Sequence, residues 1–155
     1  MRSIHSWLDE YGDSHRNPVN KRVHWVCVPL IVLSLIGLLW SLPVPASWSV
    51  RTPFLNWGVL FIALALVYYY ALAWRLAIGM TVVTLAVIAI VAAASRLSYP
   101  LWAVSAGVFV LAWIGQFIGH KIEGRKPSFF KDIQFLLIGP LWLLAFVYRR
   151  AGIGY

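Results

Sequence analysis

Residues 54–95 form an almost unbroken apolar run, and this run limits the possible folds of the chain more than any other feature. As a single helix it would be about 60 Å long, twice the thickness of the hydrocarbon core of a bilayer. The run must therefore fold back on itself. Trp74 and Arg75 mark the place, because three tyrosines precede them and Gly79 follows them. We predict two spans, residues 54–73 and 76–95, joined by a tight helical hairpin.

The rest of the chain has the same character. Hydrophobic residues make up 61% of the 155 residues and charged residues only 12%, too many apolar groups for one soluble core. Two further runs predict spans at residues 25–42 and 101–119. A last run, residues 133–148, is interrupted by glycine and proline and is short, so that it either crosses the membrane or re-enters. We predict an all-α integral membrane protein with four to five transmembrane helices in a single domain, residues 1–155.

A short amphipathic helix is predicted before the first span, at residues 3–12. Its apolar positions recur at the spacing i, i+3, i+4 and i+7, and they are Ile4, Trp7, Leu8 and Tyr11. Ser3 is a suitable N-cap and Gly12 a suitable end of the helix. We expect this helix to lie in the membrane interface.

The first polar group of interest precedes the first span. Pro18 suits the first turn of a new helix, which makes Asn17 its N-cap. Asn20 and His24 then lie four residues apart on one face. His15 precedes the turn and can fold back beside His24. In the alternative interpretation, these are ordinary polar residues at the level of the lipid headgroups.

The second polar group ends the span at residues 101–119. Gln116, His120 and Glu123 follow at i, i+4 and i+7, so an amide, an imidazole and a carboxylate share one helix face. Gly115 and Gly119, also four apart, form a neighbouring smooth face that lets another helix approach closely. The alternative is a packing motif that ends in a polar cap at the water boundary.

Both histidine groups are predicted to emerge on the same side of the membrane, because an even number of spans separates His24 from His120. Most cations fall on that side: Arg2, Arg16, Lys21, Arg22, Arg75, Lys121, Arg125, Lys126 and Lys131, against Arg51 and Arg96 on the other. The positive-inside tendency makes the histidine side cytoplasmic. The net charge of +8 is divided among short clusters between apolar runs, which favours lipid headgroups as partners and excludes a continuous groove for nucleic acid.

Three histidines, His15, His24 and His120, can therefore meet at one membrane face. Imidazole suits iron, zinc, copper or nickel, and a single cysteine excludes a zinc knuckle or an iron–sulfur cluster. Asn20, Gln116 and Glu123 lie near enough to orient the rings of the metal ligands or to take part in catalysis. Glu123 could complete a ligand set of two histidines and one carboxylate, but we expect it to form a hydrogen bond with the free imidazole nitrogen of a ligand. The residues thus predict a metal site of unspecified metal.

Two motifs carry a resemblance to a known family. They are His15-Arg-Asn-Pro-Val-Asn with His24, and Gln116-Phe-Ile-Gly-His120-Lys-Ile-Glu-Gly-Arg-Lys-Pro127. Together they resemble the family of the fungal 2-hydroxy fatty acid dioxygenase, which degrades phytosphingosine to odd-chain fatty acids, and the compact chain is more similar to its bacterial relatives. The resemblance extends from His15 to Trp142. It implies a bacterial inner-membrane enzyme that uses Fe(II) and dioxygen for the α-oxidation of a 2-hydroxy fatty acid, with the family's histidines at His15, His24 and His120.

This implied reaction agrees with the rest of the sequence. Shortening a 2-hydroxy acid by one carbon, with release of carbon dioxide, yields the four electrons that reduce dioxygen fully. No nucleotide cofactor is then required, and no glycine-rich phosphate motif is present. Lys121 and Arg125 are candidates to attract the substrate carboxylate. Two other classes remain: a non-catalytic membrane module that binds a metal or haem, and a lipid-binding scaffold.

Overall fold

The computed structural model describes residues 2–49 and 54–155, and within these ranges the chain is helical and contains no strand. The elements are α1 (Ile4–Asp13), α2 (Pro18–Trp40), α3 (Ala46–Ser49), α4 (Trp57–Ala94), α5 (Leu101–Glu123), the 3-10 turn η1 (Ser128–Phe130) and α6 (Phe135–Arg150). The predicted all-α class is confirmed. Arg51, assigned above to the side opposite the histidines, lies outside the described residues.

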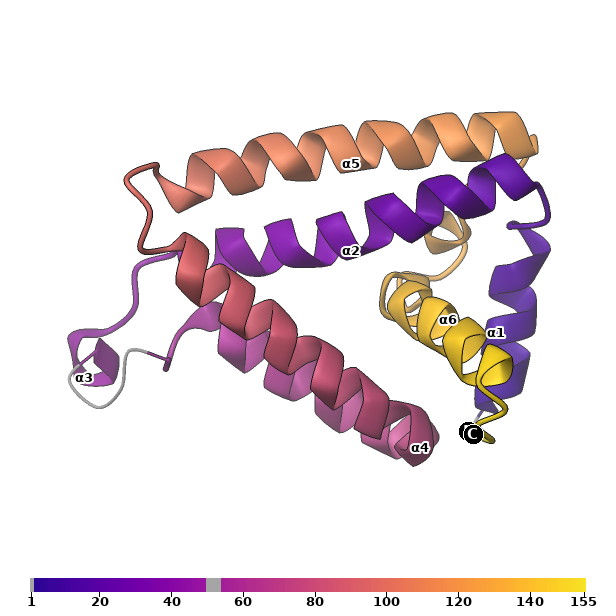
Figure 1. The fold of residues 1–155 in the computed structure, drawn as a ribbon, viewed down its shortest axis with the longest axis horizontal. Coiled ribbons are helices and arrows are strands. Elements are labelled where there is room, and N and C mark those ends of the chain that lie inside the picture. The colour runs from indigo at the N-terminus through magenta and orange to yellow at the C-terminus, as the bar shows by residue number, and fades with distance from the viewer. Residues whose placement is uncertain (1, 50–53) are drawn as a thin grey trace.

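Three helices, α2, α4 and α5, are long and apolar enough to cross a membrane. Helix α2 begins where the sequence predicts: the side chain of Asn17 accepts a hydrogen bond from the amide of Val19 at 2.8 Å, and Pro18 occupies the first turn. Helices α2 and α5 lie side by side (Figure 1). The two glycines permit this approach, since a Cβ at Gly119 would lie 2.4 Å from Asn20 Oδ1 and a Cβ at Gly115 would lie 2.7 Å from Cys27 Sγ.

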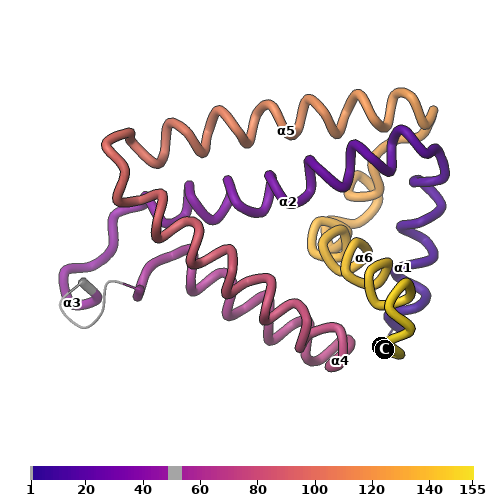
Figure 2. Tube along the Cα trace, viewed as in Figure 1, coloured from indigo at the N-terminus to yellow at the C-terminus, as the bar shows by residue number. Residues whose placement is uncertain are grey.

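Helix α4 is a hairpin rather than one straight rod. Its 38 residues are interrupted at Ala73, where φ is −160° and ψ is 84°, and its two arms run back along each other (Figure 2). The hydroxyl groups of Tyr70 and Thr81 lie 3.1 Å apart, although eleven residues of a straight helix span about 16 Å. The predicted reversal is therefore confirmed, and the break lies at Ala73, directly before Trp74.

Helix α1, which was expected to lie in the membrane interface, packs its apolar stripe against another helix of the protein. Ile4, Trp7, Leu8 and Tyr11 are buried against α6, where they share a core with Phe135, Ile138 and Trp142. The rings of Trp7 and Phe135 meet edge to face, with centroids 5.1 Å apart. On the outer side, Glu10 pairs with Arg2 and with Lys131, which ties α1 to the loop before α6. The stripe faces another helix because α6 carries a complementary apolar face.

Helix α6 closes the end of the bundle where α1 and the tip of α4 lie (Figure 1). Its 16 residues extend about 24 Å, less than the roughly 30 Å of a hydrocarbon core, and it is not among the three helices that suit a membrane span. The hydroxyl of Tyr69 donates to the carbonyl of Leu137 at 2.8 Å, and that of Tyr148 donates to the carbonyl of Arg75 at 3.3 Å. The last helix is thus hydrogen-bonded to both arms of the hairpin.

Candidate metal centre

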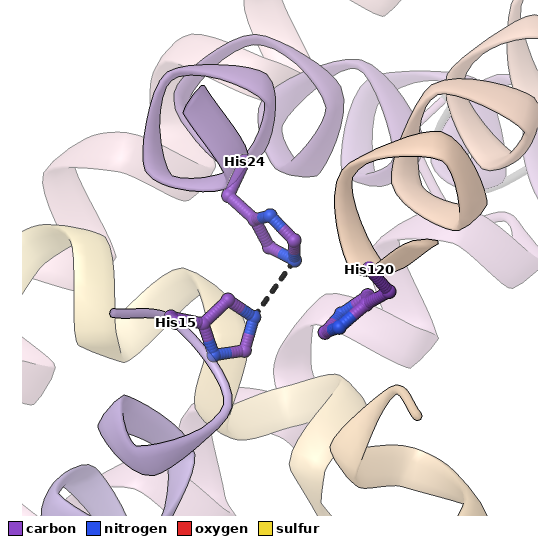
Figure 3. A group of neighbouring side chains, drawn as sticks. All are labelled: His15, His24 and His120. Carbon is purple, nitrogen blue, oxygen red and sulfur yellow. Dashed lines mark hydrogen bonds between the residues drawn. The ribbon is translucent and has the colours of Figure 1, made fainter. Parts of the chain in front are cut away.

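Three histidines from separate segments converge at one end of the bundle. His15 lies in the turn between α1 and α2, His24 lies near the start of α2, and His120 lies in the last turn of α5. Their rings point toward one another (Figure 3), and one nitrogen from each lies within 4.8 Å of the others. All three side chains are buried, with exposed fractions of 1%, 1% and 5%. This is the group that the two polar segments of the sequence predicted.

Backbone carbonyl groups fix the orientation of two of the rings. His15 Nδ1 lies 2.5 Å from the carbonyl oxygen of Tyr11, and His24 Nδ1 lies 2.9 Å from that of Asn20. The ring of Tyr11 also stacks on that of His15, with centroids 4.1 Å apart. Because a carbonyl oxygen only accepts hydrogen bonds, each Nδ1 must carry the proton. In a neutral ring, Nε2 is then left with a free lone pair.

The two free lone pairs face each other. His15 Nε2 and His24 Nε2 are 2.8 Å apart (Figure 3), and neither carries a proton that could lie between them. A charged ring would supply one, but burial, and then the proximity of His24, lowers the pKa of His15 to about 3. His120 Nδ1 is also buried, without a hydrogen-bond partner among the described residues. A metal cation would be bound by the facing nitrogens of His15 and His24 together with one nitrogen of His120, so the residues fit such an ion.

The low pKa of His15 gives a testable pH dependence of stability. Its ordinary value is 6.5, so the unfolded chain takes up a proton as the pH falls through 6.5, whereas the folded chain does so only near pH 3. The folded state is therefore disfavoured progressively between these values. We expect the midpoint temperature of thermal unfolding of the metal-free protein to be constant above pH 6.5 and to fall below it. In His15→Asn, which cannot titrate, the fall should be shallower; an unchanged slope would contradict this assignment.

Glu123 has a different partner from the one the sequence suggested. It was expected to bind the free nitrogen of a ligand histidine, but within the described residues it makes no hydrogen bond to a histidine. Its carboxylate accepts the backbone N–H groups of Arg16 and Asn17, both at 2.9 Å, and the side-chain amide of Asn20 at 3.1 Å. The reason is that α5 continues one turn past His120 and ends beside the first turn of α2, where N–H groups are free and a negative charge is favoured.

Asn20 connects these groups. It is fully buried, its backbone carbonyl orients His24, and its side-chain amide donates to Glu123 and to the carbonyl of Ser14 at 3.2 Å. Asn20 and Glu123 together hold the turn that carries His15. Their expected role in positioning the histidines therefore has a structural basis, through the backbone rather than through the rings.

Other expected site residues lie elsewhere. Gln116 is buried but lines a pocket next to the histidines, and within the described residues its Oε1 has no hydrogen-bond partner. Lys121 and Arg125, the expected carboxylate-binding cations, are exposed and do not line that pocket. Lys121 is rotated by about 100° around the helix from His120, which directs it outward. That they attract a substrate carboxylate stays a prediction, and from these positions they would act outside the pocket.

Three further residues that were not predicted contribute to the site. Tyr11 was assigned only to the apolar stripe of the first helix, although its carbonyl and ring hold His15. Ser14 lies 3.2 Å from His15 Nδ1 and 2.6 Å from the hydroxyl of Ser128. A signal for Tyr11 was its spacing of four residues before His15. Ser128 had none, because it comes from a distant loop.

An apolar pocket opens beside the histidines. His24 and His120 form one wall with Gln116, while Val28, Ile31 and Val32 of α2 and Phe135 and Leu136 of α6 line much of the rest. The α2 residues follow His24 along one helix face, so the pocket extends from the histidines toward the middle of the bundle. Its lining thus combines imidazole and amide groups at the histidines with apolar side chains beyond them.

These features define a helical protein with membrane-suited helices and a buried centre of three imidazoles beside an apolar pocket. The chain belongs to the Mpo1-like family, described as 2-hydroxy-palmitic acid dioxygenase Mpo1-like, whose family model matches residues 1–151. The resemblance found in the two histidine motifs is thereby confirmed. Comparison with curated proteins gave no significant match, and comparison with solved structures gave none either.

Proposed function

We propose that this protein is an Fe(II)-dependent membrane dioxygenase that converts a 2-hydroxy fatty acid to the fatty acid one carbon shorter. The reaction R–CH(OH)–COOH + O₂ → R–COOH + CO₂ + H₂O balances in atoms and in its four electrons, without a further reductant. The family description, which names a 2-hydroxypalmitic acid dioxygenase, supports the substrate class. The observation that carries the proposal is the pair of facing Nε2 lone pairs of His15 and His24 next to His120.

The three histidines would hold the iron. When bound, ferrous iron would supply the redox chemistry that activates dioxygen toward the 2-hydroxy acid. The carbonyls of Tyr11 and Asn20 keep Nε2 of His15 and His24 unprotonated and directed at the centre. Burial of the rings limits access of water, and the apolar residues of α2 that line the pocket would contact the alkyl chain. The lipid-facing bundle would give the substrate a direct route from the membrane.

The proposal includes an orientation in the membrane. Counting the two arms of α4 separately, α2, α4 and α5 make four spans, an even number, and the starting end of α2 and the final end of α5 lie together (Figure 1). The segments that we assign to this side of the membrane carry most of the cations. The positive-inside tendency therefore favours a site on the cytoplasmic side of a bacterial inner membrane.

The direct test is reconstitution. Protein purified anaerobically in detergent is analysed for metal, loaded with ferrous iron, and given 2-hydroxyhexadecanoate and oxygen without any keto acid, flavin or nicotinamide. We expect pentadecanoate, carbon dioxide and consumed oxygen in equal amounts. A matched sample loaded with zinc, which has no redox chemistry, should form no product.

Other results would point to the other two classes. A b-type haem spectrum in the purified protein, with no pentadecanoate formed, would indicate an electron-transfer or sensing module. Failure to bind any metal, with unchanged thermal stability after chelation, would indicate a lipid-binding scaffold. Either result would disprove the proposed dioxygenase function.

A further inference from the structure

A line of unpaired polar atoms runs along α5 from the histidine centre into the pocket. Trp113, Gln116 and His120 follow one another at i, i+3 and i+7, so they share one face of the helix, and all three line the pocket. Trp113 Nε1, Gln116 Oε1 and His120 Nδ1 are each buried and, among the described residues, lack a hydrogen-bond partner. Buried polar atoms are almost always paired in folded proteins. His120 belongs to the candidate metal centre, but Trp113 Nε1 and Gln116 Oε1 lie beyond it on residues that line one pocket, and these two unpaired atoms indicate a missing polar ligand.

The side chains of Trp113 and Gln116 are held in place. The indole of Trp113 packs edge to face on Phe129, with centroids 5.1 Å apart, and lies against Phe117 at 5.8 Å. The side chain of Gln116 is only 6% exposed. Trp113 offers a single N–H donor and Gln116 a carbonyl acceptor with an NH₂ donor. The two groups therefore present a fixed set of neutral hydrogen-bonding atoms next to the imidazoles.

The lining of the pocket limits the chemistry of the ligand. No lysine, arginine, aspartate or glutamate is among the described residues that line it. An anionic head would therefore be recognised by neutral donors together with the ion at the histidines, and the apolar walls on α2 and α6 would contact a hydrocarbon chain. A 2-hydroxy fatty acid has both an anionic head and a hydrocarbon chain. Its hydroxyl group would donate the hydrogen bond that Gln116 Oε1 is missing.

We propose that Trp113 and Gln116 form the headgroup subsite, in which the indole N–H donates to a carboxylate oxygen and Gln116 Oε1 accepts from the 2-hydroxyl group. This inference rests on the proposed function and extends it to the recognition of the substrate. An acid without the 2-hydroxyl leaves the buried carbonyl of Gln116 unpaired, and a site of this kind discriminates strongly against such an analogue. Gln116 thus selects hydroxylated acids, whereas Trp113 binds the carboxylate that all fatty acids share.

The test measures binding without turnover. Metal-loaded protein in lipid nanodiscs is titrated under anaerobic conditions with radiolabelled 2-hydroxyhexadecanoate and, separately, with hexadecanoate. The wild type should prefer the hydroxylated acid. Gln116→Leu should bind it about tenfold more weakly, the effect of losing one hydrogen bond, while its affinity for hexadecanoate changes little. Trp113→Phe should weaken the binding of both acids by a similar factor.

Two controls separate this role from others. Trp102→Phe removes an indole N–H from an exposed position on the same helix and should change neither affinity. Metal content and thermal midpoint should be unchanged in all variants, since the subsite lies beside the ligands. Should Gln116→Leu fail to fold, Gln116→Met, unbranched and similar in length, carries the same test.

The outcomes distinguish the subsite from the activity. If the wild type prefers the hydroxylated acid and Gln116→Leu keeps that preference, the subsite is wrong and the proposed function stands. The same conclusion follows if Gln116→Leu loses the metal, because Gln116 would then support metal binding and not substrate binding. If the wild type binds neither acid, the proposed function fails and the subsite fails with it.

Discussion

Replacing His120 by alanine should remove the bound iron and abolish the oxidation of 2-hydroxyhexadecanoate, and the same should hold for His15→Ala and His24→Ala. Each change leaves only two imidazoles, which hold ferrous iron weakly because no other side chain of the cluster can replace the third. The loss of activity should exceed the roughly 10 to 100-fold typical of residues that only support a ligand. Metal analysis after gel filtration and the yield of pentadecanoate are the two measurements.

His5→Ala is the matched control for this series. His5 is exposed and stacks on Tyr155 at 5.6 Å, away from the other three histidines, so its removal should change neither iron content nor product. Because His15 and His24 are buried, their replacement by glutamine, which keeps polar volume, checks that the loss is not one of folding. Full iron occupancy in the His24 and His120 variants would disprove the metal assignment.

Glu123→Gln should have a smaller and different effect. The carboxylate accepts the N–H groups of Arg16 and Asn17, one on each oxygen, and an amide can keep only one of these contacts while placing an NH₂ group against the other. The turn that carries His15 would loosen. We expect iron to remain bound at saturation, with affinity reduced about 10 to 100-fold and part of the activity retained. Competition with a chelator of known affinity measures the change.

Glu10→Gln provides the comparison, because Glu10 is also a doubly paired carboxylate but contacts Arg2 and Lys131 at the surface. Its iron affinity should equal that of the wild type. If Glu123→Gln instead loses iron as completely as His120→Gln, with an unchanged thermal midpoint, then Glu123 binds the metal directly. One of the three histidines would in that case have another role.

Local rules predicted where α1 and α2 begin and that the chain reverses, although α1 extends to Asp13, one residue past its expected end at Gly12. Ser3 and Asn17 cap helices as their side-chain chemistry dictates, and the apolar run was too long for one span, so a break near Trp74 was required. The environment of α1 could not be predicted in this way. An amphipathic stripe shows that a helix needs an apolar partner, and both lipid and α6 satisfy that need.

The candidate site was likewise predictable only in part. The expected even number of spans predicted that His24 and His120 lie at one end, and spacing along the helix predicted Glu123 near His120. Spacing within one helix could not show that Glu123 would bind the amides of another segment, Arg16 and Asn17, because a backbone N–H has no signature in the sequence. The spacing of Tyr11 before His15 was a signal for that residue, but it could not show that the backbone carbonyl of Tyr11 would bind the ring. The exposure of Lys121 could not be predicted either, because charge alone does not give the direction of a side chain.

The three histidines come from segments near the two ends of the sequence, and this has a consequence for how long the protein persists. An ion bound by His15, His24 and His120 acts as a cross-link between the turn after α1, the start of α2 and the end of α5. Binding to the folded chain alone stabilises it in proportion to the logarithm of the free metal concentration. Metal supply would then control the survival of the protein against proteolysis, so that starved cells would lose the polypeptide itself and not merely its activity.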